Sequence, residues 1–450
     1  MKFCLTLAAT VLLGAISLEA HAQQPWLSDR AAGEGIGIRV GDLELHPGIA
    51  GEVGYDSNYF LRSSEEHPLS AYVLRVTPAI SLSTLGAQRG AGTASTAPVI
   101  FRGGAYASFN ELIAADSAHS SDFSDQRHVD VGSDLALTLF PQSRVGVDSY
   151  LNFVRMVQPS NDTDTENAFN RDSLRAGAGA TWRPGGGLFD WRLGYEFLYN
   201  YFEKVAFRSD DNYQNTVNMR TRWRFLPRTA VLYTGSYTRV TYADNVTQND
   251  GDIVRSSIGL NGLVTSRVSL LGMVGWAGTF YGQRPGGTVP QQFDSLTAQA
   301  EVKWFMSGGQ DVMSTAPVGL SYATLGYTRD VSNSYLGNFY QRDRGYAGFS
   351  YMLGGMFVTS LDLGISNLSF PDSFFADGGL QHKAFSEQRF DGRLFGEYRA
   401  SSIVGINTTI SYDQNITHVR IPTDEQNPQN APDFLAFSHW QVFLGVRLFW

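Results

Sequence analysis

The chain has 450 residues, of which only 17% are charged, against about 25% in typical soluble proteins. It carries a net charge of −9 and contains 29 Phe, 21 Tyr and 47 Gly. The negative charge argues against nucleic acid as a partner. No tract rich in proline, in glycine and serine, or in one sign of charge divides the chain, which predicts a single folded domain.

The amino terminus has the pattern of a secretory signal peptide. Lys2 precedes an apolar run that ends near Leu18, and Ala20-His21-Ala22 places small residues around a cleavage site. The only cysteine lies inside this segment, so we expect a mature protein without thiols. The predicted organisation is a signal peptide at 1–22, a short periplasmic segment at 23–45 and a barrel domain at 46–450.

The rest of the chain has strand patterning and no helix pattern long enough to span a membrane. No later apolar run approaches the ~20 residues that a membrane-spanning helix needs. Eighteen segments instead alternate, or are rich in aromatic and β-branched residues, between turn-forming clusters. These segments are 47–60, 71–83, 98–111, 127–140, 144–157, 171–183, 188–202, 212–226, 229–242, 252–264, 267–281, 292–306, 317–330, 340–353, 355–370, 386–400, 402–417 and 436–450.

The connections between these segments alternate in length. Short turns such as 141–143 and 227–228 alternate with long polar loops such as 158–170 and 418–435, with exceptions at 84–97 and 307–316. An antiparallel barrel places alternate connections on opposite sides of its membrane, with short turns in the periplasm and long loops outside. We therefore predict an all-β fold, an up-and-down transmembrane β-barrel of about 18 strands in the outer membrane of a Gram-negative bacterium, with both termini periplasmic.

The last segment has the pattern of a barrel's closing strand, although a terminal strand of a soluble sandwich can also alternate in this way. Trp182, Trp223 and Trp304 end other segments on the same predicted side, as an interfacial aromatic girdle requires. We expect the barrel-assembly machinery to recognise the apolar face of the last strand, which consists of Trp440, Leu444, Val446, Leu448 and Trp450.

The opposite face of many segments is charged, and we expect it to line a wet lumen. Eighteen strands enclose a space too wide for wall side chains to fill, so a channel is expected, narrowed by an external loop or by long inward side chains. One interpretation is that arginines and carboxylates pair across neighbouring strands, and the acidic residues interspersed among the arginines favour it. The other is that the arginines form a positive track for an anionic polymer. The candidates are Arg175, Asp190, Arg192, Glu196, Arg220, Arg222, Arg224, Glu301, Lys303, Arg342, Arg344, Arg389, Asp391, Arg393, Glu397 and Arg399.

Motifs for catalysis or metal binding are absent from the sequence. It contains no HExxH, no CxxC and no glycine-rich phosphate loop, so we predict neither an enzyme nor a cofactor. Asp162, Asp164 and Glu166 alternate as calcium ligands could. A short acidic run of this kind is more often a solvated loop, and we predict no metal site.

The start of the first segment carries a family resemblance. Residues 40–49, VGDLELHPGI, and then 54–60, GYDSNYF, resemble the opening of the β-barrel porin-2 family, its myxobacterial members above all. The resemblance implies an outer-membrane barrel associated with export of exopolysaccharide or capsule, beside a periplasmic polysaccharide-export protein. It implies no catalytic residue.

The resulting hypothesis is an outer-membrane conduit for a secreted polysaccharide. Tyr106, Tyr150 and Tyr346 lie on predicted inward faces and are candidates for stacking on sugar rings. The alternative is a general or substrate-selective diffusion porin for small solutes, and a third reading is a surface adhesin or receptor. A loop folded into the lumen would favour the porin.

Overall fold

The computed structural model describes most of the chain after the predicted signal peptide. The described residues are 37–84, 97–124, 126–157, 170–185, 187–243, 249–283, 290, 292–306, 321–334, 338–354, 356–374, 380–421 and 433–450. Residues 1–36, the acidic residues at 162–166 and the connections 85–96 and 307–320 therefore lie outside the described part. Among the described residues, helices are too short or too polar to cross a membrane.

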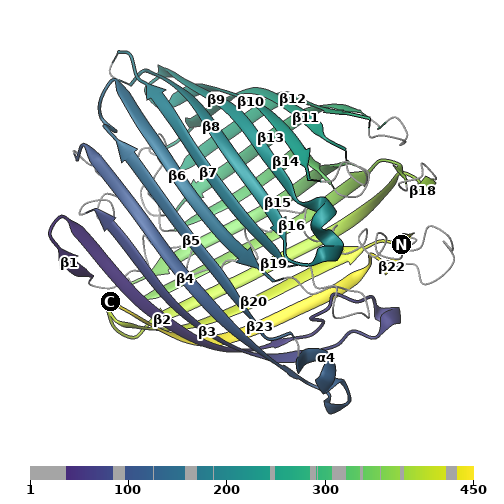
Figure 1. The fold of residues 1–450 in the computed structure, drawn as a ribbon. Helices are drawn as coiled ribbons and strands as arrows, with labels where there is room; N and C mark the ends of the chain where they lie inside the picture. The colour runs from purple at the N-terminus through teal and green to yellow at the C-terminus, as the bar shows by residue number, and fades with distance from the viewer. Residues whose placement is uncertain are drawn as a thin grey trace.

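Eighteen antiparallel strands close into a barrel, which confirms the predicted fold and strand number (Figure 1). Each strand pairs with its neighbour in the chain, and β2 pairs with β23 to close the circle. The strands are β2 (Leu43–Asp56), β3 (Ala71–Thr84), β4 (Val99–Ala114), β5 (His128–Leu139), β6 (Val145–Met156), β7 (Arg171–Trp182), β8 (Phe189–Phe202), β9 (Asn212–Leu226), β10 (Thr229–Tyr242), β11 (Gly251–Leu263), β12 (Val268–Tyr281), β13 (Phe293–Phe305), β14 (Tyr322–Asn333), β15 (Phe339–Leu353), β16 (Phe357–Phe370), β19 (Phe385–Arg399), β20 (Val404–Ile416) and β23 (Phe437–Phe449).

Smaller elements decorate the two ends of the barrel. In Figure 1, β1 (Ile38–Val40) and the carboxyl terminus lie at one end, which we call the short-turn end. The opposite, long-loop end carries the helix α4, the strand β18 and the strand β22. The sequence did not predict these additions, which are α4 (Ser120–Ser124), the pair β17 (Ser373–Phe374) and β18 (Leu380–His382), the pair β21 (Arg420–Ile421) and β22 (Asp433–Phe434), and the 3-10 turns η1 (Ser64–Glu66), η2 (Ser117–His119) and η4 (Val205–Asp210).

Most predicted strand ends fall within three residues of the observed ends. The first strand differs more, since the segment predicted at 47–60 is β2 at Leu43–Asp56. A second strand, predicted at 317–330, is described as β14 at Tyr322–Asn333, and residues 317–320 lie outside the described part. The first strand stops early because the carboxylate of Asp56 accepts the backbone N–H of Asn58, which starts a turn. The second continues because its last residues still pair with β15.

The outer wall of the barrel is apolar. Along β2, for example, Ile49 and Val53 are 46% and 57% exposed, whereas the intervening Ala50 and Glu52 are buried. The girdle tryptophans Trp182, Trp223, Trp304 and Trp450 are about half exposed, all at the short-turn end. A closed wall with apolar side chains outside and every backbone group paired is the arrangement that lipid requires of strands.

The seam between the first and last barrel strands is closed by nine residue pairs, from Gly48 opposite Phe449 to Asp56 opposite Gln441. At the long-loop end, the buried Asp56 lies 2.9 Å from Nε2 of His439 and accepts a hydrogen bond of 2.7 Å from the Gln441 amide. Two residues before Asp56, a Cβ on Gly54 would overlap the ring of Phe443. The seam thus depends on close approach as well as on hydrogen bonds.

We expect Gly54→Ala to destabilise the folded barrel by about 1–3 kcal/mol, because the buried Phe443 ring must move. The matched control is Gly51→Ala on the same strand, where a Cβ meets nothing within 4 Å. The measurement is the urea dependence of the folded fraction, followed by the shift in electrophoretic mobility on heating. Equal midpoints for the two variants would show that the seam does not need this glycine.

Candidate functional site: the lumen and its mouth

Side chains from alternate strands meet inside the barrel, which identifies the inward face. Arg447 of β23 donates to Glu397 of β19 at 2.6 Å, across β20. The hydroxyl of Tyr346 on β15 donates to Glu301 of β13 at 2.7 Å, across β14. Only the concave side of a curved wall lets side chains two strands apart converge in this way. The strand registers then place every charged lumen candidate on an inward position of β7, β8, β9, β13, β15 or β19.

Most of these charges are paired with one another. Glu397 is 1% exposed and accepts hydrogen bonds from Arg447 at 2.6 Å and from Arg399 at 3.1 Å. Asp391 binds Arg344 and lies 3.8 Å from Arg342. Pairing of this kind lets charged groups line a narrow lumen without leaving buried charges uncompensated.

The opposite wall repeats the pattern. Arg192 donates to Asp148 at 3.0 Å and to Asn218 at 3.0 Å, and Arg222 donates to Asp190. On the same strands β6 and β8, Glu196 accepts a hydrogen bond from the hydroxyl of Tyr150. The structure therefore brings most of the candidates together as local pairs rather than as one uninterrupted positive row.

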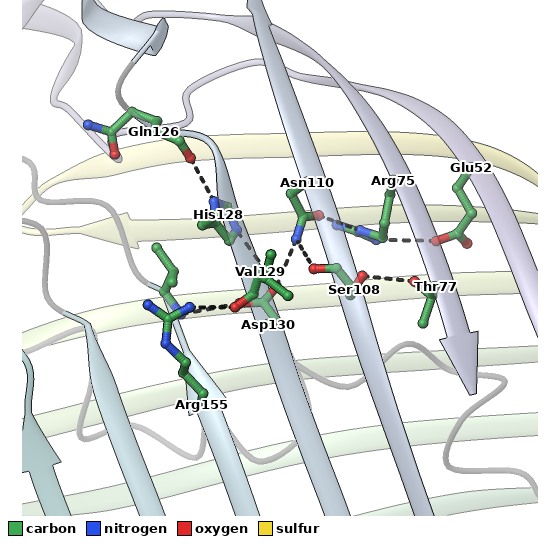
Figure 2. A network of polar contacts seen from close by, with 11 residues as sticks. Glu52, Arg75, Thr77, Ser108, Asn110, Gln126, His128, Val129, Asp130 and Arg155 are labelled. Atoms are coloured by element: carbon green, nitrogen blue, oxygen red, sulfur yellow. Dashed lines mark hydrogen bonds and ion pairs between the residues drawn. The ribbon is translucent and has the colours of Figure 1, made fainter. Parts of the chain in front are cut away.

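The sequence did not predict a polar network on the inward face of β2 to β5, which is shown in Figure 2. Arg75 donates to Glu52 at 3.4 Å and to the Asn110 side chain at 2.9 Å, and Asn110 donates to Asp130 at 2.9 Å. Asp130 lies 3.6 Å from His128. The signal was present in the strand register, because all five positions share the inward face, but the separate segments contain too few charges to stand out.

This network lines a cavity of about 240 Å³ that extends past the seam to β19 and β20. Arg75 and His128 border it from one side, and Arg389, Arg393 and Asp413 border it from β19 and β20. Nearer the short-turn end, Phe395 of β19 packs with Ala50 of β2, three strands away around the wall. The lumen is therefore narrow beside the seam.

The three tyrosines proposed for sugar stacking lie along the wall. Each ring covers a glycine on the adjacent strand: Tyr106 covers Gly132, Tyr150 covers Gly177 and Tyr346 covers Gly326. A Cβ at any of these glycines would overlap the ring. The hydroxyls of Tyr150 and Tyr346 are engaged by Glu196 and Glu301, which fixes both rings in the wall.

The loop between β2 and β3 folds over the mouth of the lumen at the long-loop end. Phe60 of this loop is 1% exposed, and Phe123 of the helix α4 is 2% exposed. The centroids of their rings are 5.2 Å apart. They pack with Val73, Leu112 and Phe443, which occupy inward positions of β3, β4 and β23. Beside them, burial raises the pKa of the Tyr59 hydroxyl, and the carboxylates of Asp56 and Asp130 raise it further. We call Tyr59, Phe60 and Phe123 together the aromatic cap.

A second element narrows the mouth from the opposite side. β14 pairs with β13 only as far as Arg329 opposite Ala298, and beyond this point it pairs with β15 alone. Val331 and Phe339 take the outward register there, yet they are 1% and 4% exposed. They pack with Tyr281 and other inward residues of β12 and β13. The end of the β14–β15 hairpin has therefore separated from the wall and folded inward.

Polar contacts hold this folded-in hairpin, which comprises residues 330–334 and 338–340. Arg255 of β11 donates to the carbonyl of Val331 at 2.6 Å, and the hydroxyl of Tyr281 donates to the carbonyl of Asn338 at 2.9 Å. Asn333 donates to the hydroxyl of Tyr242 at 2.6 Å. The predicted segments 317–330 and 340–353 left 331–339 as one of the long polar external loops. The structure instead continues β14 to Asn333 and starts β15 at Phe339, and the apolar side chains of Val331 and Phe339 are buried.

A cavity of about 540 Å³ lies along β8 to β14, against the base of the folded-in hairpin. Arg192, Arg220 and Arg255 border it together with hydroxyl and amide side chains of the intervening strands. Among the described residues there is no group of three or more His, Cys, Asp or Glu that could hold a metal ion. The arrangement is suited to contact with hydrated solutes.

The search of protein-family models and the search of curated proteins found no match. Among solved structures, the chain is similar to the copper transporter OprC, with 12% identity, a TM-score of 0.44 and coverage of 92% of this chain and 81% of that one. It is similar to the outer membrane protein opdK from Pseudomonas aeruginosa, with 11% identity, a TM-score of 0.41 and coverage of 90% and 99%.

It is also similar to the FrpB iron transporter from Neisseria meningitidis, with 10% identity, a TM-score of 0.42 and coverage of 84% of this chain. The match spans only 62% of the FrpB chain. At these identities and TM-scores the likeness is too distant to assign a function.

We expect Glu397→Leu to destabilise the barrel by about 3–5 kcal/mol, because it leaves the buried Arg447 guanidinium without its carboxylate. The control is Glu111→Gln, which breaks a more exposed pair with Arg127 and is expected to leave the urea midpoint nearly unchanged, because solvent screens an exposed ion pair. Urea unfolding of both purified proteins measures the difference. A Glu397→Leu protein as stable as the control would contradict the assignment of Glu397 as a structural anchor.

Proposed function

We propose that the protein is an outer-membrane transport barrel that acts as a selective diffusion channel for small polar solutes. The observation that carries this proposal is the mouth of the lumen, which is narrowed from two sides by packed elements. The aromatic cap covers one wall and the folded-in hairpin covers the other. Both are held by buried apolar contacts, so the narrowing belongs to the folded state.

A narrowed mouth selects by size. An unobstructed barrel of eighteen strands would admit large solutes, because wall side chains alone do not fill it. Here Phe60 and Phe123 on one side and Val331 and Phe339 on the other occupy part of the opening with nearly buried side chains. Small solutes remain compatible with this geometry, whereas a bulky hydrated polymer would have to displace at least one of these elements.

The lining of the lumen supports passage of polar solutes. Paired arginines and carboxylates keep water in the channel and leave few strong sites at which a solute would be trapped. Weak and distributed contacts are what a conducting pathway needs, because a tightly held solute would not leave.

Export of a polysaccharide, which the family resemblance suggests, is the second candidate. The observation that favours it is the flat placement of Tyr106, Tyr150 and Tyr346 on the wall, since such rings could stack with sugars. In that case the barrel would act beside a periplasmic polysaccharide-export protein. Under either function we propose that both termini are periplasmic and that the barrel-assembly machinery inserts the chain through the outward apolar face of β23.

Liposome swelling by the purified protein tests the channel. We expect permeation of glucose and a steep fall in rate towards tetrasaccharides. Phe339→Ala removes a ring that anchors the folded-in hairpin, so it should raise tetrasaccharide permeation several-fold. The control is Phe349→Ala on the outward face of the same strand, which should leave the size dependence unchanged.

A deletion strain separates the two candidate functions. The diffusion channel predicts slower uptake of small polar solutes and unchanged surface polysaccharide. Loss of extracellular polymer with unchanged small-solute permeability would overturn it in favour of export.

A further inference from the structure

Arg220 differs in its environment from Arg192 and Arg222, the two arginines beside it on the inner wall. It lies on the inward face of β9 between Arg222 and Asn218, and its side chain is exposed to the lumen. Among the described residues no carboxylate lies within ion-pair distance of its guanidinium. The neighbouring Arg192 and Arg222, by contrast, are both paired.

The charges around Arg220 leave a local excess of positive charge. Asp148 and Asp190 are its nearby acids. Asp148 is already bound by Arg192, and Asp190 is bound by Arg222 and lies 3.7 Å from Arg183. Both carboxylates are therefore compensated by other cations. The guanidinium of Arg220 therefore remains available to a solute that enters the cavity.

Arg220 borders the 540 Å³ cavity at the base of the folded-in hairpin. The three other cations on the cavity wall each have an acidic neighbour or partner. Arg192 binds Asp148, and Arg329 lies 3.6 Å from Asp343. Arg255 binds the hairpin at the Val331 carbonyl and lies 3.4 Å from Asp330. The remaining wall is rich in neutral hydrogen-bonding groups, which include Thr234, Ser236, Ser257, Thr297 and Gln299.

We propose that this cavity is a binding subsite for a small hydroxylated monocarboxylate, such as a free sugar acid, whose carboxylate is bound by Arg220. One available guanidinium matches one carboxylate, since the planar fork of arginine binds this group through two hydrogen bonds. The hydroxyl and amide side chains around it match the hydroxyl groups of a sugar. Asp330 on the same wall would disfavour a second negative charge.

The inference deepens the proposed channel and rests on it. The subsite lies within the lumen, so a solute would meet it on its way through. The same carboxylate chemistry could belong to a free sugar acid or to a uronic acid residue in a polysaccharide. The folded-in hairpin at the edge of the cavity favours the free acid, because a chain would have to continue past it.

The test is calorimetric titration of the detergent-solubilised protein with sodium glucuronate, with glucose as the neutral counterpart. We expect glucuronate to bind more tightly than glucose, and Arg220→Gln to weaken glucuronate binding roughly 10- to 100-fold while leaving glucose binding unchanged. Arg239→Gln is the matched control, because it makes the same change to an arginine on the outward face of the adjacent strand, where Asp252 pairs with it. Heat-modifiable mobility checks that each variant is folded.

Three outcomes would overturn the subsite. In the first, the wild-type protein binds glucuronate no more tightly than glucose. In the second, the Arg220→Gln variant binds glucuronate as tightly as the wild type does. In the third, tetragalacturonate binds more tightly than galacturonate, and this binding depends on Arg220. Conductance of the wild-type protein in a planar bilayer is measured separately. Conductance without Arg220-dependent binding would refute the subsite alone, whereas the lack of conductance would refute the channel itself.

Discussion

The pairing of β2 with β23 is the interaction on which the rest of the structure depends. In lipid, an unpaired strand edge leaves backbone N–H and carbonyl groups without partners, so the sheet has to close. Nine residue pairs close it here, and the buried Asp56 and the contact of Gly54 with Phe443 fix their alignment. Closure in turn creates a concave inner face, on which the charges of alternate strands can meet.

Both charged and aromatic side chains shape the inner face of the barrel. Ion pairs such as Arg447 with Glu397 stabilise the wall, and tyrosines that lie on glycines thicken it without filling the lumen. The mouth is shaped differently. There, apolar side chains of the aromatic cap and of the folded-in hairpin bury one another inside the barrel, in a place where a simple pore would be wet.

In the proposed function, the folded-in hairpin is the element that makes the channel selective. The pairing of β14 with β13 ends at Arg329, so the hairpin beyond this residue can pack against the inner wall. Arg255 and Tyr281 hold it there by hydrogen bonds to its backbone. The same separation places the base of the hairpin beside the cavity that Arg220 borders. Size selection at the mouth and charge selection below it would thus arise from one irregularity in the sheet.

The sequence by itself determined the number of strands, most of their ends, the alternation of short and long connections, and the face on which the charges lie. All of these follow from period-two patterns and turn residues that are local in the chain. The tertiary structure alone decided that Arg192 pairs with Asp148 while Arg220 stays available, that His128 and Asn110 join one network, and that Val331 and Phe339 turn inward. These outcomes depend on register and curvature, which bring together residues far apart in the sequence, and no local pattern contains that information.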